Sequence, residues 1–240
     1  MGTFDNFFTT ELPGEIISSL IVMGIIAILA IIIGIQAHFH DPLKKPKGLL
    51  LVAEYGVEFF DNFTENLIGK KLPGIGGLIM ALASYLFLSF IFGLTGLPSP
   101  ATNLAVPLSL GLTTFLGIHI VSIRKTKWAY FKRYIDPFPF FLPVNLISMW
   151  APLLSLSLRL FGNAVAGWTL MTLVYGAMGT LGDVVITWAD ESLHLGSVFA
   201  PMLTSVLHAY FDLFSAFIQT TVFISLSTIF LGQEVPDIEE

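Results

Sequence analysis

The length of its apolar runs limits what this chain can fold into more than any other feature. Residues 16–35 form an apolar run of about 20 residues, which is enough to cross the roughly 30 Å hydrocarbon core of a bilayer. Residues 74–94 and 104–123 form two similar runs, and two longer apolar segments follow at 140–175 and 198–231. Only 12% of the residues are charged, whereas a soluble domain has about 25%. The sequence therefore predicts an all-α integral membrane protein with about five membrane-crossing helices.

The first apolar run is predicted to be a retained transmembrane helix. A secretory signal peptide carries basic residues before a shorter apolar core. Here the residues that precede the run are acidic instead, at Asp5, Glu11 and Glu15. With this run kept, we expect residues 1–240 to form a single membrane domain.

The last two apolar segments are too long for simple spans. At a rise of 1.5 Å per residue, each would be roughly 50 Å long as a helix, against roughly 30 Å of hydrocarbon. An ordinary tilt of about 20° does not absorb this excess. Either each segment splits into shorter pieces, or the two lie steeply tilted as a long hairpin, which is the arrangement we predict.

Residues 49–69 are predicted to form an amphipathic helix rather than a span. Their acids recur at spacings of four, three and four residues, which places them on one helical face opposite an apolar one. The helix therefore lies at the membrane surface or packs on the protein's own loops, and we predict the interfacial position. The acids are Glu54, Glu58, Asp61 and Glu65, and the apolar residues are Val52, Phe59, Phe63 and Leu67.

The distribution of cations predicts the topology. Of the 11 Lys and Arg residues, all but one lie at residues 44–71 and 124–133. Five crossings would put both of these zones on the same side of the membrane. By the positive-inside rule that side is cytoplasmic, so we expect the N-terminus outside and the C-terminus inside.

Several classes of function find no support in the sequence. The net charge is −6 and no basic stripe is present, so nucleic acid is not an expected partner. The chain has no cysteine, which excludes disulfides, thiol chemistry and Cys-ligated metals. It contains no phosphate loop, no GxSxG motif and no HExxH motif, and we expect neither a cofactor nor a metal.

The remaining cation, Arg159, lies in the middle of an apolar segment. A cation at the centre of a bilayer costs about 2.5–3.5 kcal/mol on insertion scales, so something must offset it. A structural ion pair or a snorkelling side chain is the simpler interpretation. An ion pathway or a charged partner is the functional interpretation, which we favour. Ser155 and Asn163 lie one turn to either side and complete a polar stripe, flanked by small residues that allow close approach, namely Gly162, Ala166 and Gly167.

A second polar stripe is predicted on the last apolar segment. His208, Asp212, Ser215 and Gln219 follow the spacing of a single helical face. Such a row can relay protons through water, or it can serve as interhelical hydrogen bonding, worth about 0.6 kcal/mol per contact. A direct salt bridge between Arg159 and Asp212 is a third alternative. We favour a water-filled path beside Asp212.

Four motifs give the chain a resemblance to a known family. The stretch SLSLRLFGNAVAG at residues 155–167 fits SLxLRLFGNxxAG, a highly specific signature of subunit a of the bacterial and chloroplast F-type ATP synthases. NLAVPLSLGL from Asn103, PVN from Pro143 and FIQ ending at Gln219 agree with the same family. The chain thus resembles subunit a over most of its length, and more weakly before residue 70.

This resemblance implies a mechanism and partners. Subunit a is a non-catalytic stator subunit beside a rotating ring of c subunits, and its other partners are b-type peripheral stalk subunits, further ATP synthase subunits and the lipid bilayer. The resemblance implies a multi-pass protein of the bacterial plasma membrane. Two aqueous half-channels lead to the ring from opposite faces, and Arg159 matches the arginine that separates them. The expected role is ion translocation, with the proton as the expected ion.

The resemblance also implies roles for the neighbouring polar residues. Ser155, Asn163 and Gln219 match polar positions near the arginine. Asp212 falls where the family often has a His or an acid on the outer half-channel.

Two departures from the family pattern stand out. The usual partner position of Asp212 is Trp168 here, and His208, one turn from Asp212, is the expected replacement. The stretch NLISMWAP at residues 145–152 lacks the acids that the family tends to have there. The cytoplasmic half-channel is therefore left without acidic candidates.

Two other functions stay open from the residues alone. A stand-alone ion-coupled transporter could use Arg159 for an anionic substrate, but such carriers often have inverted repeats and no internal repeat is visible. A purely structural membrane subunit would use Arg159 and Asp212 as a buried pair.

Overall fold

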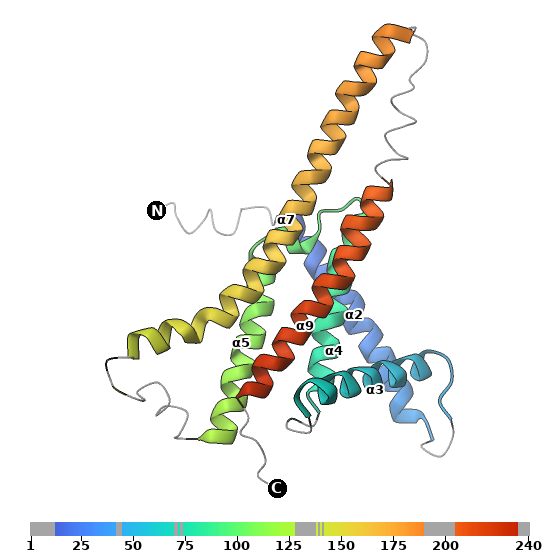
Figure 1. The fold of residues 1–240 in the computed structure, drawn as a ribbon. Helices are drawn as coiled ribbons and strands as arrows, with labels where there is room; N and C mark the ends of the chain where they lie inside the picture. The colour runs from blue at the N-terminus through green and yellow to red at the C-terminus, as the bar shows by residue number, and fades with distance from the viewer. Residues whose placement is uncertain are drawn as a thin grey trace, which may run out of the picture.

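The computed structural model describes residues 13–41, 45–69, 72, 74–127, 138, 140, 142–189 and 205–234, and their regular structure is helical throughout (Figure 1). Five of the helical segments are long and apolar enough to cross a membrane. This confirms the predicted all-α membrane fold. The elements are α2 (Gly14–Phe39), α3 (Leu49–Ile68), α4 (Gly76–Ile91), the 3₁₀ turns η2 (Phe92–Thr95) and η3 (Pro100–Thr102), α5 (Ala105–Thr126), α7 (Leu142–Ala189), the π-helix η5 (Ala209–Phe214) and α9 (Ser215–Gln233).

The core of the bundle lies where α4, α7 and α9 meet. Ile79 and Leu86 of α4, Leu156 and Leu160 of α7, and Phe223 of α9 are each no more than 1% exposed. Lipid tails are as apolar as these side chains, so close packing and hydrogen bonds, rather than the hydrophobic effect, hold the helices together.

Helix α5 joins this core through close approach to α7 and a polar contact with α9. A Cβ built at Gly111 would overlap the Oγ of Ser157 and lie 3.2 Å from the carbonyl oxygen of Leu153, so the two helices touch at backbone distance. The buried hydroxyls of Thr114 and Ser227 lie 3.3 Å apart and link α5 to α9.

Helix α3 lies across the lower ends of the spans, as an interfacial helix does (Figure 1). Phe60 and Phe63 pack against the core. The predicted apolar face is only partly the packing face, because Val52 and Phe59 are 68% and 63% exposed. The helix therefore has a face that packs on the protein, an exposed acidic face and an exposed apolar face suited to lipid.

Helix α7 is unbroken over 48 residues and contains Pro152. Its first turns run sideways before the helix bends upward (Figure 1). Proline causes such bends, because it lacks an N–H and its ring clashes with the carbonyl four residues earlier. The predicted end at residue 175 is wrong: the helix continues to Ala189. The more polar stretch after residue 175 contains no proline that would end it.

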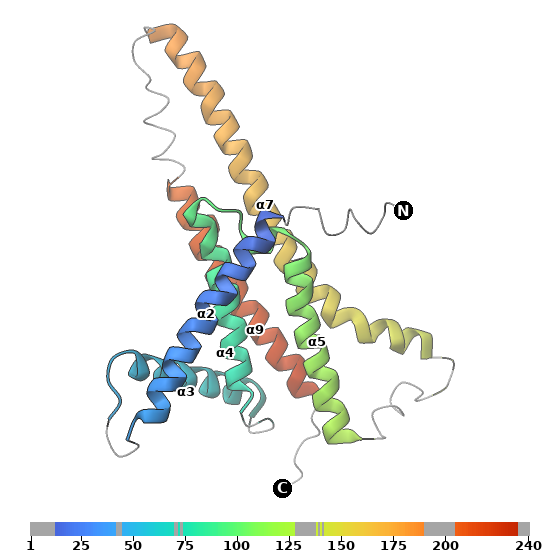
Figure 2. The same ribbon diagram turned by 180° about the vertical axis from the view of Figure 1, so that it is seen from behind.

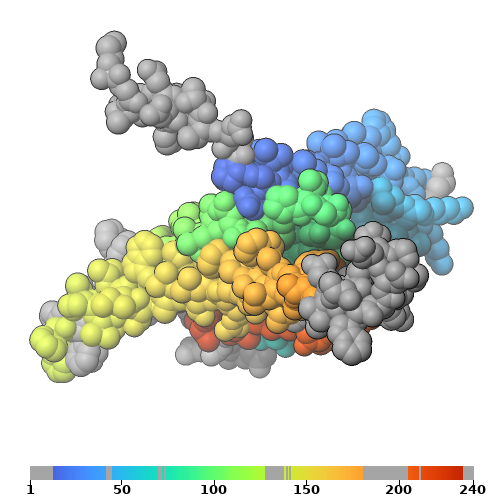
Figure 3. All heavy atoms as spheres, turned by 90° about the horizontal axis from the view of Figure 1, so that it is seen from above, coloured from blue at the N-terminus to red at the C-terminus, as the bar shows by residue number. Residues whose placement is uncertain are grey.

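The last apolar segment is described from Ser205 to Gln233, so residues 198–204 of the predicted span lie outside the described residues. It runs back beside α7, and both helices lean relative to α2, α4 and α5 (Figure 2). Viewed from above, α7 and α9 occupy one side of the molecule and α2 the opposite side (Figure 3). Of the two predicted alternatives, the structure has the tilted hairpin.

Candidate functional site

Arg159 lies on an open face of α7. Ser155, Arg159 and Asn163 are all exposed, whereas Leu156 and Leu160 on the adjoining face are buried. Among the residues that the structure describes, Arg159 makes no hydrogen bond and no ion pair. The direct salt bridge between Arg159 and Asp212 is therefore absent, and with it the buried pair that a purely structural role required.

The small residues beside Arg159 also face open space. A Cβ built at Gly162 or Gly167 would meet no atom of the described chain within 4 Å. Ala166 is exposed as well. Gly111 shows the contrast, since a side chain there would press on α7. Gly162 and Ala166 thus leave room for a partner outside this chain, whereas Gly167 lines a cavity that α7 forms with other helices of the chain.

The polar groups predicted on the last apolar segment straddle a π-helix. The backbone N–H of Ser215 donates to the carbonyl of Tyr210, five residues earlier, as well as to that of Asp212. Single π-turns inside α-helices are frequent at functional sites. The sequence pattern assumed a uniform α-helix, so this local change of register was not predicted.

His208 and Asp212 are hydrogen-bonded, with 2.5 Å between Nδ1 of His208 and Oδ2 of Asp212. On its other side, Nε2 of His208 lies 2.7 Å from the hydroxyl of Tyr175 on α7. The expected pairing of His208 with Asp212 is therefore present. Tyr175 was not predicted, because its approach to His208 depends on how the two long helices align.

Asn163 and Gln219 connect the two polar stripes. Nδ2 of Asn163 donates a 2.6 Å hydrogen bond to Oε1 of Gln219. Gln219 is 4% exposed. This bond ties α9 to the turn of α7 that directly follows Arg159.

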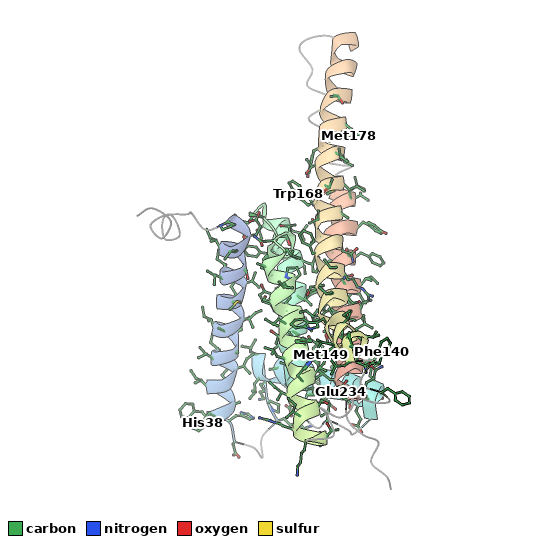
Figure 4. All side chains as sticks on the ribbon, turned by 90° about the vertical axis from the view of Figure 1, so that its left-hand side faces the viewer. His38, Phe140, Met149, Trp168, Met178 and Glu234 are labelled. Atoms are coloured by element: carbon green, nitrogen blue, oxygen red, sulfur yellow. The ribbon has the colours of Figure 1, made fainter. Side chains whose placement is uncertain are left out.

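A cavity of about 640 Å³ brings most of these groups together. Asn163, His208, Asp212 and Ser215 all line it, and α2 and the turns between α4 and α5 complete its wall. Trp168 also lines it and is 64% exposed. Figure 4 shows Trp168 near the level where the neighbouring helices end and α7 continues above them.

Not every predicted site residue reaches this cavity. Ser155, Arg159 and Gln219 do not line it. Gln219 is connected to the cavity by its hydrogen bond with Asn163, which is a lining residue. The stretch 145–152, which lacks acids, is mostly exposed, and the Trp150 ring stacks on Phe115 with 5.0 Å between ring centres. The geometry thus gathers His208, Asp212 and Asn163 on one side of Arg159.

Comparison with known proteins shows the family of the chain. The family model of the ATP synthase A chain matches residues 16–232. ATP synthase subunit a of Mycoplasma pneumoniae is 32% identical over 90% of this chain and 77% of its own length. Subunit a of Mycoplasmoides gallisepticum is 30% identical over 92% of this chain and 78% of its own, and that of Streptococcus agalactiae is 30% identical over 92% of both. A multi-pass membrane chain with an arginine on an open helix face beside a polar cavity, and with these relatives, belongs to the family of ATP synthase subunit a.

Proposed function

We propose that this chain is the ion-translocating stator subunit of a rotary F-type ATP synthase and does not itself hydrolyse ATP. In this role it works beside a ring of c subunits and is held by b-type peripheral stalk subunits. One observation carries the proposal: Arg159 has no partner among the described residues of its own chain, and it lies one turn from Asn163, which lines the polar cavity.

An unpaired cation on an open face of a membrane helix calls for an outside partner. Leaving it in lipid costs about 2.5–3.5 kcal/mol, and the small residues beside it leave room for a close approach. A carboxylate on a ring subunit supplies the opposite charge. Attraction between the two is strong in a low dielectric, so each ring carboxylate that reaches Arg159 has to be ionised. That requirement separates ions that enter from those that leave.

The cavity serves as the outer half-channel. Apart from Arg159, the described cations gather at the other end of the bundle, at Lys45 and Lys47 after α2 and at Arg124, Lys125 and Lys127 at the end of α5. The positive-inside rule makes that end cytoplasmic. The cavity then opens to the outside of a bacterial plasma membrane, with the N-terminus outside and the C-terminus inside.

Within the half-channel, Asp212 and His208 take up the ion from water. Their 2.5 Å hydrogen bond lets a proton move between a carboxylate and an imidazole. Ser215 and Asn163 continue the polar lining towards the ring. Gln219 holds Asn163 in position, and Ser155 extends the ring-facing stripe beyond Arg159.

The test is ATP-driven proton pumping by inverted membrane vesicles that carry Arg159→Ala. Lumen acidification should be abolished while ATP hydrolysis by the detached catalytic sector is unchanged. Arg124→Ala is the matched control, since it removes the same charge from an exposed site at the cytoplasmic end of α5, and it should pump normally. Full coupled pumping by Arg159→Ala would refute the proposed function.

A further inference from the structure

The cavity beside α9 has a second carboxylate, Glu15, which comes from the first turn of α2. Glu15 is half-buried and makes no hydrogen bond or ion pair with the residues that the structure describes. We propose that Glu15 is a further residue of the ion path, which draws cations from outside into the cavity and passes them towards Asp212. This inference rests on the proposed function, because it adds a residue to the outer half-channel.

The negative charge of the cavity comes only from α2 and α9 among the residues that line it. Helix α7 contributes Asn163, Trp168 and Met171 together with small or apolar residues, none of them charged. The turns after α4 add the apolar Leu97 and Pro98, and the uncharged Ser99 and Thr102, whose hydroxyls donate to backbone carbonyls. A cleft with charge of one sign between low-dielectric walls focuses the field and concentrates counter-ions. Two carboxylates between such walls form a cleft of this kind for cations.

The two carboxylates differ in their hydrogen bonding. Asp212 is hydrogen-bonded to His208, which also contacts Tyr175. Glu15 has no such partner in the described chain, so its oxygens are available to water and to an entering ion. Glu15 therefore serves as the group that meets the ion first, and Asp212 with His208 as the next.

The fold fixes Glu15 at the cavity through an anchored helix end. The helix has 26 residues, and its buried residues all lie in the second and third turns. There Ser19 lies 2.6 Å from the hydroxyl of Tyr85 on α4. One residue before Glu15, a Cβ at Gly14 would lie 3.1 Å from Cγ of Pro98. The buried residues of α2 are Ser18, Ser19 and Val22.

A purely structural role for Glu15 makes a different prediction. An acid in the first turn of a helix interacts favourably with the helix dipole, so its loss would lower the amount of folded subunit. An ion-path role instead lowers the pumping rate of each complex that has assembled. The two roles are separated by dividing the pumping rate by the amount of subunit in the purified complex.

The first experiment compares Glu15→Gln with the wild-type complex in reconstituted vesicles. Proton pumping per assembled complex should fall by about tenfold, the lower end of the effect of a focusing charge on ion arrival. Glu58→Gln is the matched control, because Glu58 is an exposed acid on α3 and does not line the cavity; it should pump like the wild type. Glu15→Asp, which keeps the charge, should retain most of the rate.

A second experiment restores the charge chemically. The chain has no cysteine, so Glu15→Cys introduces its single thiol. The purified complex is treated with a thiol reagent that adds either a sulfonate or a trimethylammonium group, and it is then reconstituted. The sulfonate should raise pumping and the ammonium should not, while the treated wild-type complex accounts for thiols on other subunits.

The outcomes separate this inference from the proposed function. If Arg159→Ala stops pumping while Glu15→Gln pumps at the wild-type rate per complex, Glu15 is not part of the path and the proposed function stands. Equal effects of the sulfonate and the ammonium on Glu15→Cys would also overturn the inference. If Arg159→Ala itself pumps normally, both proposals fall together.

Discussion

Asn163 on α7 and Gln219 on α9 are joined by a 2.6 Å hydrogen bond, although they lie 56 positions apart in the chain. Gln219 is buried, and its Nε2 has no hydrogen-bond partner among the described residues. Asn163 is exposed and lies one turn after Arg159. The bond therefore sets the alignment of the two long helices at the point where Arg159 faces outward.

The two sides of this bond should respond differently to substitution. Asn163→Ala leaves the buried Gln219 amide with no described partner and should lower the free energy of unfolding by about 1–3 kcal/mol. Gln219→Met removes an amide whose Nε2 is already unpaired and should be nearly neutral. Adding Gln219→Met to Asn163→Ala should recover stability, measured as the thermal midpoint of the purified membrane sector. A double variant that is less stable than Asn163→Ala alone would contradict this account.

The Asp212 carboxylate should be required for rapid ion transfer. Asp212→Asn keeps the shape of the side chain and should lower proton pumping by about 100-fold, the lower end of the usual effect of a proton-transferring group. Tyr175→Phe removes only the hydrogen bond to Nε2 of His208 and should cost less than Asp212→Asn. Initial rates of lumen acidification measure both effects. Wild-type rates in Asp212→Asn would mean that these polar groups are interhelical hydrogen bonding and not a relay.

Spacing along one helix was enough to predict which candidate residues share a face or a contact. Ser155, Arg159 and Asn163 share a face because they are four residues apart, and the structure has them together on the open face of α7. His208 and Asp212 are four residues apart as well, and they are in contact. Patterns of this kind need no knowledge of how helices pack.

Contacts between helices could not be predicted in the same way. Tyr175 reaches His208, and Glu15 reaches the cavity, only because of how α7 and α2 are aligned against α9 and α4. Alignment depends on packing at positions such as Gly111, which a hydropathy pattern does not specify. In the sequence, Glu15 argues against a signal peptide, and the only pointer to the proposed role is that this acid directly precedes the first span.

Replacement of the Arg159 guanidinium by an ammonium should also block coupled pumping. Arg159→Lys keeps the charge, but lysine is a compact and strongly hydrated point charge without the planar fork of five donors that arginine offers a carboxylate. We expect pumping to be lost, with subunit assembly unchanged because no described residue of this chain bonds to Arg159. Lumen acidification and the amount of subunit in the purified complex are measured together. Normal pumping by Arg159→Lys would mean that charge alone is enough.

The close approach of α5 to α7 should be sensitive to a single methyl group. A Cβ at Gly111 would overlap the Oγ of Ser157 and crowd the Leu153 carbonyl, so Gly111→Ala should lower the free energy of unfolding by about 1–3 kcal/mol. Gly117 on the same helix is the matched control. A Cβ there would lie 3.6 Å from Cδ2 of Leu231, an ordinary contact.

Because alanine favours helix by about 1 kcal/mol over glycine, Gly117→Ala should be neutral or slightly stabilising. Thermal midpoints of the two purified variants give the comparison.

The packing of α5 on α7 supports the buried side of the helix whose opposite face carries Arg159. Gly111→Ala should therefore also lower pumping in the complexes that still assemble. Equal stability of the two alanine variants would show that α5 and α7 have room to separate, and that the position of Arg159 does not depend on this contact.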